Sequence, residues 1–476
     1  MNEAFHPAAA QAAAQSRLRG FESGAREIDA ASLRVEGSVP RWLRGALLLN
    51  GPALWELPGG ALQHWFDGYA MQHRIAIDGG TAPSYRSRFV RSDAYLRSVA
   101  AGKPVYGEFG SANPASLWSR LRGPQATDNP AVVMSRHGER WIAVTETPHL
   151  TYFDPATLAT EGRVDLGAPE LPLHLMAAHG FTLADGSYLN VGTQLGAKCR
   201  QTLFRVAPGA TRPVAIGSVA MPKAGYTHAF ALAPDHAIVW ECALRAQPLA
   251  FRFGAGAVKD NFRWEPGHGS AIHAIALVGG AVRSWRIPPM FAFHAVQAFA
   301  DGADLVLELS VYDDGLAFDD LTLARRRQGA PLRSIPRLVR YRLRDGAAEA
   351  QPEPLGVALE LPQAHPAACG KRRASVCWGS GFGARGEFLD RTLRVDLDRG
   401  ETATWQRANA LHLEPLFVAR PGGEGDDDGV LLVPTLADGD AASVVCIVDA
   451  RTMQCVAELH APQVIPFGFH AAFAAA

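Results

Sequence analysis

Short apolar segments, separated by glycine, proline and polar turn residues, recur along most of the chain. The sequence of 476 residues contains 47 glycines and 32 prolines, which are spread over its whole length. Both residue types interrupt helices and favour turns, so the pattern predicts few long helices and many strands joined by tight turns. We therefore expect an all-β fold.

Three segments share a further pattern, in which a strand-like run ends in an aspartate and a second strand follows. They are residues 151–158, 394–401 and 447–453. An aspartate at the start of a turn accepts a hydrogen bond from the backbone two residues later, which explains its repeated use where the chain reverses. Irregular repetition of such hairpins favours a β-propeller, a ring of four-stranded sheets around an axis.

No low-complexity or charged linker divides the chain, so we expect one domain over residues 21–476. Residues 1–20 are rich in alanine and glutamine and are predicted to be disordered or a frayed helix. This segment lacks the long apolar core of a signal peptide, and no other stretch reaches the roughly 18 apolar residues that a transmembrane helix requires.

The charge balance and the cysteine pattern exclude several classes of protein. With 46 Lys+Arg against 47 Asp+Glu the formal net charge is -1, which gives no basic surface for nucleic acid. The six cysteines are widely spaced and include no C-x-x-C pair, which argues against a zinc ribbon or a disulfide framework. We expect a soluble cytoplasmic protein with reduced thiols and a small, neutral partner.

Two segments leave alternatives open. The acidic run 424–429 is either a calcium loop or a solvated turn, and it lacks the spaced ligands of an EF-hand, which favours the turn. The segment 104–130 contains Leu117, Trp118 and Leu121 beside two arginines. It is either an amphipathic excursion that touches a membrane surface or an ordinary packed loop.

Four histidines lie in apolar, strand-like contexts, and they are His179, His228, His294 and His470. A neutral imidazole offers one nitrogen to a metal. The long intervals between the four exclude a local metal clip, but they suit ligands that come from different blades and point at one axis. Four imidazoles without a carboxylate suit Fe(II) or Zn(II), so the pattern alone does not select the metal.

An ordered series of motifs covers nearly the whole chain. It comprises Gly37-Ser38-Val39-Pro40, Asn50-Gly51-Pro52, His64-Trp65-Phe66-Asp67-Gly68, Thr145-Glu146-Thr147-Pro148, Ala178-His179, Phe293-His294, Glu360-Leu361-Pro362, Glu414-Pro415-Leu416-Phe417-Val418, Asp427-Asp428-Gly429 and Pro466-Phe467-Gly468-Phe469-His470. This series resembles the carotenoid cleavage oxygenases, a family that includes β-carotene oxygenases, the retinal pigment epithelium isomerase, apocarotenoid oxygenases and stilbene-cleaving dioxygenases.

The resemblance implies a seven-bladed propeller, with short helices and loops that cap one face over the active site. It implies one Fe(2+) per chain on the axis, bound by His179, His228, His294 and His470. It also implies that three carboxylates hold the second imidazole nitrogens of the last three of these histidines, which fixes the ring planes. These carboxylates are, in the same order, Glu146, Glu360 and Glu414.

The activity implied by the resemblance is that of a non-haem Fe(II) dioxygenase. Such an enzyme uses O2 to cleave a conjugated double bond of a carotenoid or apocarotenoid into two carbonyl products, which are aldehydes. The protein would supply a dry apolar tunnel for this small-molecule substrate. Phe230, Phe293 and Phe469 lie near the ligands in the sequence and are expected either as walls of this tunnel or as core residues.

Several positions depart from the family pattern. Ala229 stands where many members have aspartate, and Gln297 and Ala300 stand where asparagine and glutamate are usual. These changes leave open a propeller that binds or isomerises a polyene or retinoid without oxidative cleavage. A stilbene-cleaving dioxygenase is a further alternative, for which Tyr95 matches the tyrosine of that branch. The lysine of that branch is missing near Glu139-Arg140, and arginine does not replace it because arginine stays charged.

Overall fold

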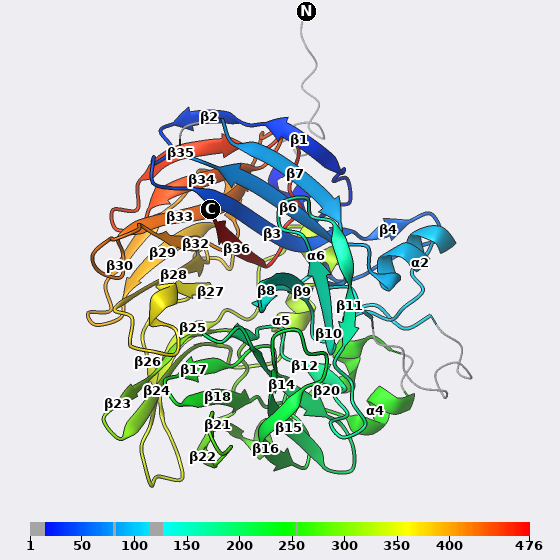
Figure 1. Cartoon of the computed structure of the whole chain (residues 1–476), viewed down its shortest axis with the longest axis vertical. Coiled ribbons are helices and arrows are strands. Elements are labelled where there is room, and N and C mark those ends of the chain that lie inside the picture. Colours follow the sequence, from blue (N-terminus) through cyan, green and yellow to red (C-terminus); the bar gives the residue numbers. More distant parts are fainter. Residues whose placement is uncertain (1–14, 80–81, 115–126, 254–255) are drawn as a thin grey trace, which may run out of the picture.

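Antiparallel strands make up most of the computed structural model, which describes residues 15–79, 82–114, 127–253 and 256–476. Within these residues, seven sheets of four to six strands surround a common axis (Figure 1). This arrangement confirms the predicted all-β class and the seven-bladed propeller. We number the blades 1 to 7 in the order in which they follow one another around the ring.

The first three blades lie in the first half of the chain, except for the C-terminal strand β36. The strands of each blade are named from the innermost to the outermost. Blade 1 contains β36 (His470–Ala475), β3 (Gly45–Leu54), β6 (Tyr69–Ile77), β7 (Ser84–Phe89) and β1 (Ile28–Ser32). Blade 2 contains β8 (Val133–His137), β9 (Arg140–Val144), β10 (His149–Phe153) and β11 (Thr160–Asp165). Blade 3 begins with β12 (Leu175–Met176) and β13 (Phe181–Thr182), which both pair with β14 (Tyr188–Gln194), and it continues with β15 (Cys199–Val206) and β16 (Val214–Met221).

The remaining four blades follow the same antiparallel plan. Blade 4 contains β17 (Ala231–Ala233), β18 (His236–Glu241), β21 (Ser270–Ala276) and β22 (Val282–Ile287). Blade 5 contains β23 (Ala295–Asp301), β24 (Asp304–Val311), β25 (Arg337–Leu343) and β26 (Pro352–Pro354). Blade 6 contains β27 (Glu360–Ala364), β28 (Val376–Gly381), β29 (Arg391–Asp396) and β30 (Thr402–Trp405). Blade 7 begins with β31 (Ala410–His412) and β32 (Leu416–Ala419), which both pair with β33 (Gly429–Ala437), and it continues with β34 (Val444–Asp449), β35 (Cys455–His460) and β2 (Arg34–Gly37).

Both ends of the described chain contribute to closing the ring. The C-terminal strand β36 is the innermost strand of blade 1, where His470 lies opposite Asn50 of β3. The N-terminal strand β2 is the outermost strand of blade 7, paired with β35. Figure 1 shows β2 beside β35 at the top of the molecule, and β36 nearer the middle beside β3. The last strand therefore places His470 on the axis only when the ring is closed.

Aspartates start the turns of the three hairpins that the sequence singled out. Asp154 Oδ1 accepts hydrogen bonds from the backbone N–H groups of Ala156 (2.9 Å) and Thr157 (2.7 Å), between β10 and β11. Asp396 and Asp449 accept the corresponding pairs of backbone N–H groups between β29 and β30 and between β34 and β35. The prediction of strand, aspartate turn and strand is confirmed at all three places.

Apolar side chains fill the spaces between neighbouring blades. One cluster joins blades 1 and 7 through residues such as Leu47, Ile75 and Ile447. Another joins blades 3 and 4 through Val191 on β14 and Val239 on β18. Burial of such side chains is worth roughly 1.5–3 kcal/mol each. Because every blade packs against two others, the ring holds its inner strands in fixed positions.

Short helices and ribbons fill the connections between strands. The helices are η1 (Ser16–Phe21), η2 (Trp65–Asp67), α2 (Asp93–Ala101), α4 (Pro248–Phe253), η3 (Val258–Asn261), η4 (Pro266–His268), α5 (Ala317–Asp320), α6 (Leu323–Arg327) and η5 (Pro366–Ala368). The ribbons are β4 (Glu56–Leu57) with β5 (Gly60–Ala61), and β19 (Leu244–Ala246) with β20 (Phe262–Trp264). Among the described helices, none has both the length and the apolar character that crossing a bilayer demands.

The N-terminal prediction was partly wrong. Residues 16–20, predicted to be disordered or frayed, belong to the packed helix η1. Leu18 and Phe21 are buried in the central core, and Arg17 pairs with Asp438 of blade 7. These apolar and ionic anchors, rather than helix propensity, order the segment. Residues 1–14 lie outside the described part of the chain.

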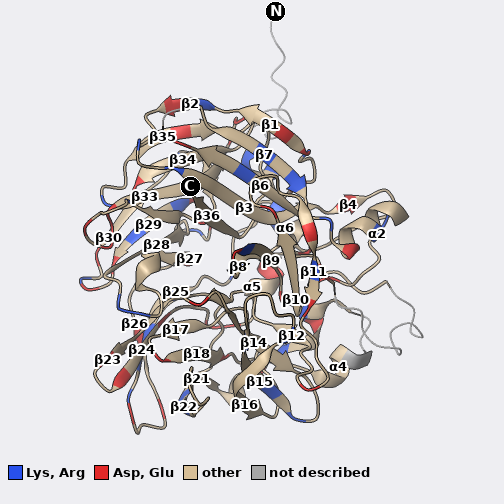
Figure 2. Ribbon diagram, in the orientation of Figure 1, with Lys and Arg blue, Asp and Glu red and all other residues tan. Residues whose placement is uncertain are grey.

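The acidic run 424–429 forms a turn, as predicted, but its aspartates are not fully solvated. Asp426 is buried and pairs with Arg372, and Asp427 pairs with Arg394 and Arg451. Its aspartates are therefore held by arginines of β29 and of neighbouring turns. Figure 2 shows acidic and basic positions mixed over the outer strands and their connections.

Candidate metal centre

The four histidines singled out in the sequence all lie at the inner edge of the ring. His179 lies between β12 and β13 of blade 3, His228 precedes β17 of blade 4, His294 precedes β23 of blade 5, and His470 begins β36 of blade 1. Each is thus near the start of an innermost strand. Because the innermost strands of a propeller surround the axis, residues at these starts converge although they are far apart in the sequence.

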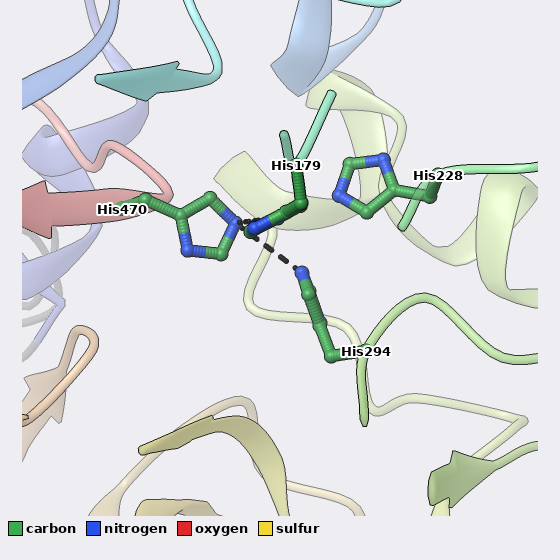
Figure 3. Close-up of side chains that lie close together, drawn as sticks. All are labelled: His179, His228, His294 and His470. Atoms are coloured by element: carbon green, nitrogen blue, oxygen red, sulfur yellow. Dashed lines mark hydrogen bonds between the residues drawn. The ribbon is translucent and has the colours of Figure 1, made fainter. Parts of the chain in front are cut away.

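The four imidazoles point at one another (Figure 3). The Nε2 atom of His470 lies 3.0 Å from Nε2 of His179 and 3.2 Å from Nε2 of His294. One nitrogen from each of the four rings lies within 4.8 Å of the others. His228, His294 and His470 are buried and His179 is partly buried, so the cluster is shielded from bulk water.

Three of the imidazoles are held from behind by carboxylates. His228 Nδ1 lies 2.7 Å from Glu146 Oε1, and His294 Nδ1 lies 2.6 Å from Glu360 Oε2. His470 Nδ1 lies 2.8 Å from Glu414 Oε1. These are the three pairs that the family resemblance implied. Glu360 begins β27 of blade 6 and Glu414 lies between β31 and β32 of blade 7, so they too come from the inner edge of the ring.

The hydrogen-bond partners of the imidazole nitrogens explain why this cluster suits a cation. In a neutral imidazole only one nitrogen carries a proton. Because Nδ1 of His294 and of His470 each donates to a carboxylate, the Nε2 atoms of both rings are left as acceptors, and these lie 3.2 Å apart. Two facing lone pairs repel each other, and a cation between them turns this repulsion into two bonds. The residues present therefore fit a metal ion.

Burial also keeps imidazoles of the cluster in the form that binds metal. The pKa of His179 is lowered well below its usual value, first by burial and then by the neighbouring histidines. Burial, followed by His470 and His228, lowers the pKa of His294 in the same direction. Both rings are neutral at pH 7 and keep a free lone pair. Burial raises the pKa of Glu360 to about 7.

Two further side chains support the carboxylates, and the sequence pattern did not identify either. The Tyr226 hydroxyl donates to Glu146 Oε1, the oxygen that also faces His228. Gln363 Nε2 donates to Glu414 Oε1 at 2.8 Å. Tyr226 lies two residues before His228, a spacing that puts side chains on one face of an extended chain and that could have identified it. No comparable signal links Gln363 to Glu414.

A mostly apolar cavity is lined by three of the four histidines, His228, His294 and His470. Its volume is about 140 Å³. Its wall includes apolar side chains from the inner strands, η2, α5 and the loops between them, among them Trp65, Phe66, Phe109, Val132, Leu175, Phe293, Ala317, Leu321, Leu332, Phe382, Phe388, Leu389 and Phe469. Short helices and loops therefore lie over the site, as the fold prediction stated.

The three phenylalanines proposed as walls occupy different places. Phe293 and Phe469 line the cavity, and the Phe293 ring lies 5.4 Å from the ring of His228. Phe230 instead packs edge-on against Phe181 at 5.0 Å, in the cluster between blades 3 and 4, and is not part of the wall of this cavity.

The positions that depart from the family pattern lie away from the cavity wall. Gln297 donates to Glu308 Oε2 at 2.8 Å and to Ala374 O at 3.0 Å, and so links blades 5 and 6. Ala229 is buried, and Ala300 is exposed at the far end of β23.

The Tyr95 hydroxyl accepts a hydrogen bond from Arg91, and Glu139 pairs with Arg136 at the surface, so neither lines the cavity. Leu117, Trp118 and Leu121 lie outside the described residues.

Comparison with known proteins gives consistent matches along the chain. The family model described as retinal pigment epithelial membrane protein (RPE65) matches residues 21–475. The chain is 30% identical over 469 residues to a rice protein named carotenoid cleavage dioxygenase 8 homolog A, with 92% of this chain and 84% of that protein covered. It is 28% identical over 474 residues to the apocarotenoid-15,15'-oxygenase of Synechocystis, with 97% and 96% covered. The crystal structure of the cobalt-substituted Synechocystis enzyme superposes with a TM-score of 0.84 at 25% identity, and covers 97% of this chain and 99% of that one.

Proposed function

Because this chain belongs to the retinal pigment epithelial membrane protein family, the family of the carotenoid cleavage oxygenases, we propose that it is a dioxygenase that cleaves a conjugated double bond of a carotenoid or apocarotenoid. The observation that carries the proposal is the buried cluster of four histidines on the axis of a propeller that matches this family from residue 21 to residue 475. The products are two aldehydes.

The metal of this site is ferrous iron, one per chain, held by the four histidines. Imidazole nitrogens suit iron among several first-row metals, and the relative whose structure matches this chain was solved with cobalt in place of its native metal. When bound, iron supplies the activation of O2, which the side chains of the protein do not provide.

The side chains of the cluster fix the positions and protonation states of the metal ligands. Glu146, Glu360 and Glu414 hold the Nδ1 protons, so that Nε2 of each partner ring faces the axis. Outer partners of this kind typically contribute about 10- to 100-fold in metal affinity or activity. His179 has no such carboxylate among its described contacts, and its backbone N–H donates to His228 O at 3.3 Å instead.

The cavity holds the polyene chain and keeps water away from it. Phe293 lies against His228, and Phe66 packs edge-on against Phe469 at 5.0 Å, so aromatic rings adjoin the histidines. A long apolar substrate gains free energy by leaving water for such a wall. The shape of the wall then determines which bond lies beside the metal.

Reconstitution with iron tests this function. Protein loaded with Fe(II) under anaerobic conditions, and then exposed to oxygen with a panel of carotenoids and apocarotenals, should give aldehydes that mass spectrometry detects. Oxygen-18 gas should label these products, which distinguishes cleavage from isomerisation. If the protein binds one iron per chain and consumes no member of the panel, the proposed function is wrong.

A further inference from the structure

One acidic side chain in the wall of the cavity has no role in holding the metal ligands. Glu108 lines the same cavity as the four-histidine cluster and is only 4% exposed. Its backbone is fixed, because its N–H donates to Ser111 O (3.0 Å) and its carbonyl accepts from the N–H of Val258 (3.3 Å). Asp67 anchors the same loop through Ser111 Oγ at 2.6 Å. Glu108 is therefore held rigidly at the cavity surface.

The other acids of the cavity wall each hold another residue in place, although Oε1 of Glu360 is buried without a hydrogen-bond partner among the described residues. Glu146 and Glu360 each hold a histidine, and Asp320 accepts hydrogen bonds from Arg333 and from the backbone of Ser334. The Glu108 carboxyl receives a single hydrogen bond from the described residues, from Thr127 Oγ1 at 2.7 Å. A buried carboxyl has more hydrogen-bonding capacity than this one contact uses.

The contacts of Thr127 determine which oxygen of Glu108 is free. Thr127 Oγ1 accepts the backbone N–H of Asn129 at 3.2 Å, so its own proton goes to Glu108 Oε1 at 2.7 Å. Oε1 is thus an acceptor, and in the neutral acid the proton sits on Oε2. Burial, followed by the nearby charge of Asp67, raises the pKa of Glu108 well above its usual value, which favours the neutral acid.

We propose that Glu108 recognises an oxygen atom at the end of the polyene substrate, an aldehyde or an alcohol, by donating a hydrogen bond to it from Oε2. This inference rests on the proposed function and names its substrate class, an apocarotenoid rather than a pure hydrocarbon carotenoid. A hydrocarbon end leaves Oε2 of this buried carboxyl without a partner, which is unfavourable. Because Glu108 and the histidines share one cavity, the contact also sets how far the chain enters and which bond faces the metal centre.

Binding of three matched ligands tests the proposal. An apocarotenal, the corresponding alcohol and the hydrocarbon with a methyl group at the same carbon are titrated into the iron-loaded protein without oxygen, and quenching of tryptophan fluorescence reports the Kd. The Glu108→Met variant should bind the aldehyde and the alcohol roughly tenfold more weakly, the value of one hydrogen bond, and the hydrocarbon within about twofold of the wild type. The Glu108→Gln variant, which keeps an N–H donor at this place, should retain most of the preference.

Two further variants separate recognition from folding. The double variant Glu108→Met with Thr127→Val removes both partners of the Glu108–Thr127 hydrogen bond. It also removes the acceptor of the Asn129 N–H, so it should lose some stability, remain folded and lose the same preference. Ser334→Ala changes a hydroxyl residue elsewhere in the wall and should leave the preference intact. Equal weakening for all three ligands, or an unaffected aldehyde in the folded double variant, overturns the proposal. A wild-type protein that binds none of the three ligands contradicts the proposed function itself.

Discussion

Replacing Glu414 by glutamine tests whether the carboxylates behind the histidines fix the metal site. Glu414 accepts three N–H groups: Oε1 faces His470 Nδ1 and Gln363 Nε2, both at 2.8 Å, and Oε2 faces the backbone N–H of Ala471 at 2.7 Å. A carboxylate accepts at both oxygens, whereas an amide accepts at one and donates at the other. Glu414→Gln therefore brings at least one N–H donor against another N–H.

The expected magnitude follows from the number of bonds lost. The better orientation of the new amide keeps its oxygen toward His470 and Gln363 and leaves the Ala471 N–H facing an NH2 group. One buried donor without an acceptor costs about 1–3 kcal/mol of the free energy of unfolding. The remaining bond to His470 is no longer charge-assisted, so the ring is held less firmly, and metal affinity should fall about 10- to 100-fold.

Metal titration and unfolding measurements together check both numbers. The Kd for Co(II) is measured on folded, metal-free protein by absorption spectroscopy against a competing chelator, and stability is measured by urea denaturation. Asp426→Asn is the matched control, because this buried aspartate also accepts several donors but lies outside the metal centre. It should lose stability and keep the metal affinity. If Glu414→Gln binds cobalt as tightly as the wild type, the carboxylate does not orient the ligand.

Three other substitutions test separate parts of the structure. Burial lowers the pKa of His64 from 6.5 to about 4, so on acidification the unfolded chain binds a proton before the folded chain does. The free energy of unfolding should therefore fall by about 3 kcal/mol as the pH drops from 6.5 to 4. Urea denaturation of His64→Asn should show a flatter pH dependence of stability, and a slope equal to that of the wild type would contradict this assignment. A Cβ on Gly468 would lie 2.5 Å from the carbonyl oxygen of Asn50, so Gly468→Ala should lower the free energy of unfolding by about 1–3 kcal/mol. It should also weaken cobalt binding, because the start of β36 has to move. An unchanged melting temperature in thermal denaturation would contradict this prediction. Tyr226→Phe removes one hydrogen-bond donor from Glu146 and should lower the free energy of unfolding, measured by thermal denaturation, by about 1–2 kcal/mol. The Kd for cobalt should change less than tenfold. Complete loss of metal binding would show that the hydroxyl does more than support the carboxylate.

Local patterns in the sequence were sufficient for the strands and their turns. The aspartates of the three hairpins satisfy their own backbone neighbours, and this interaction depends only on residues a few positions apart. The number of blades and the ligand set came from motifs that resemble a known family, since the spacing of the histidines alone did not distinguish iron from zinc. The packing of the helix η1 was missed because its anchors, Asp438 and the core around Phe21, come from distant parts of the chain.

The sequence by itself determined which residues are available for chemistry: four histidines in apolar surroundings and three glutamates in recognisable motifs. Only the closed ring decided that the Nε2 atoms of His179 and His294 lie 3.0 and 3.2 Å from that of His470. It also decided that Phe230 packs between blades and that Glu108 faces the cavity. The physical reason is that these contacts join residues dozens to hundreds of positions apart, and their geometry is fixed by the packing of each blade against its neighbours.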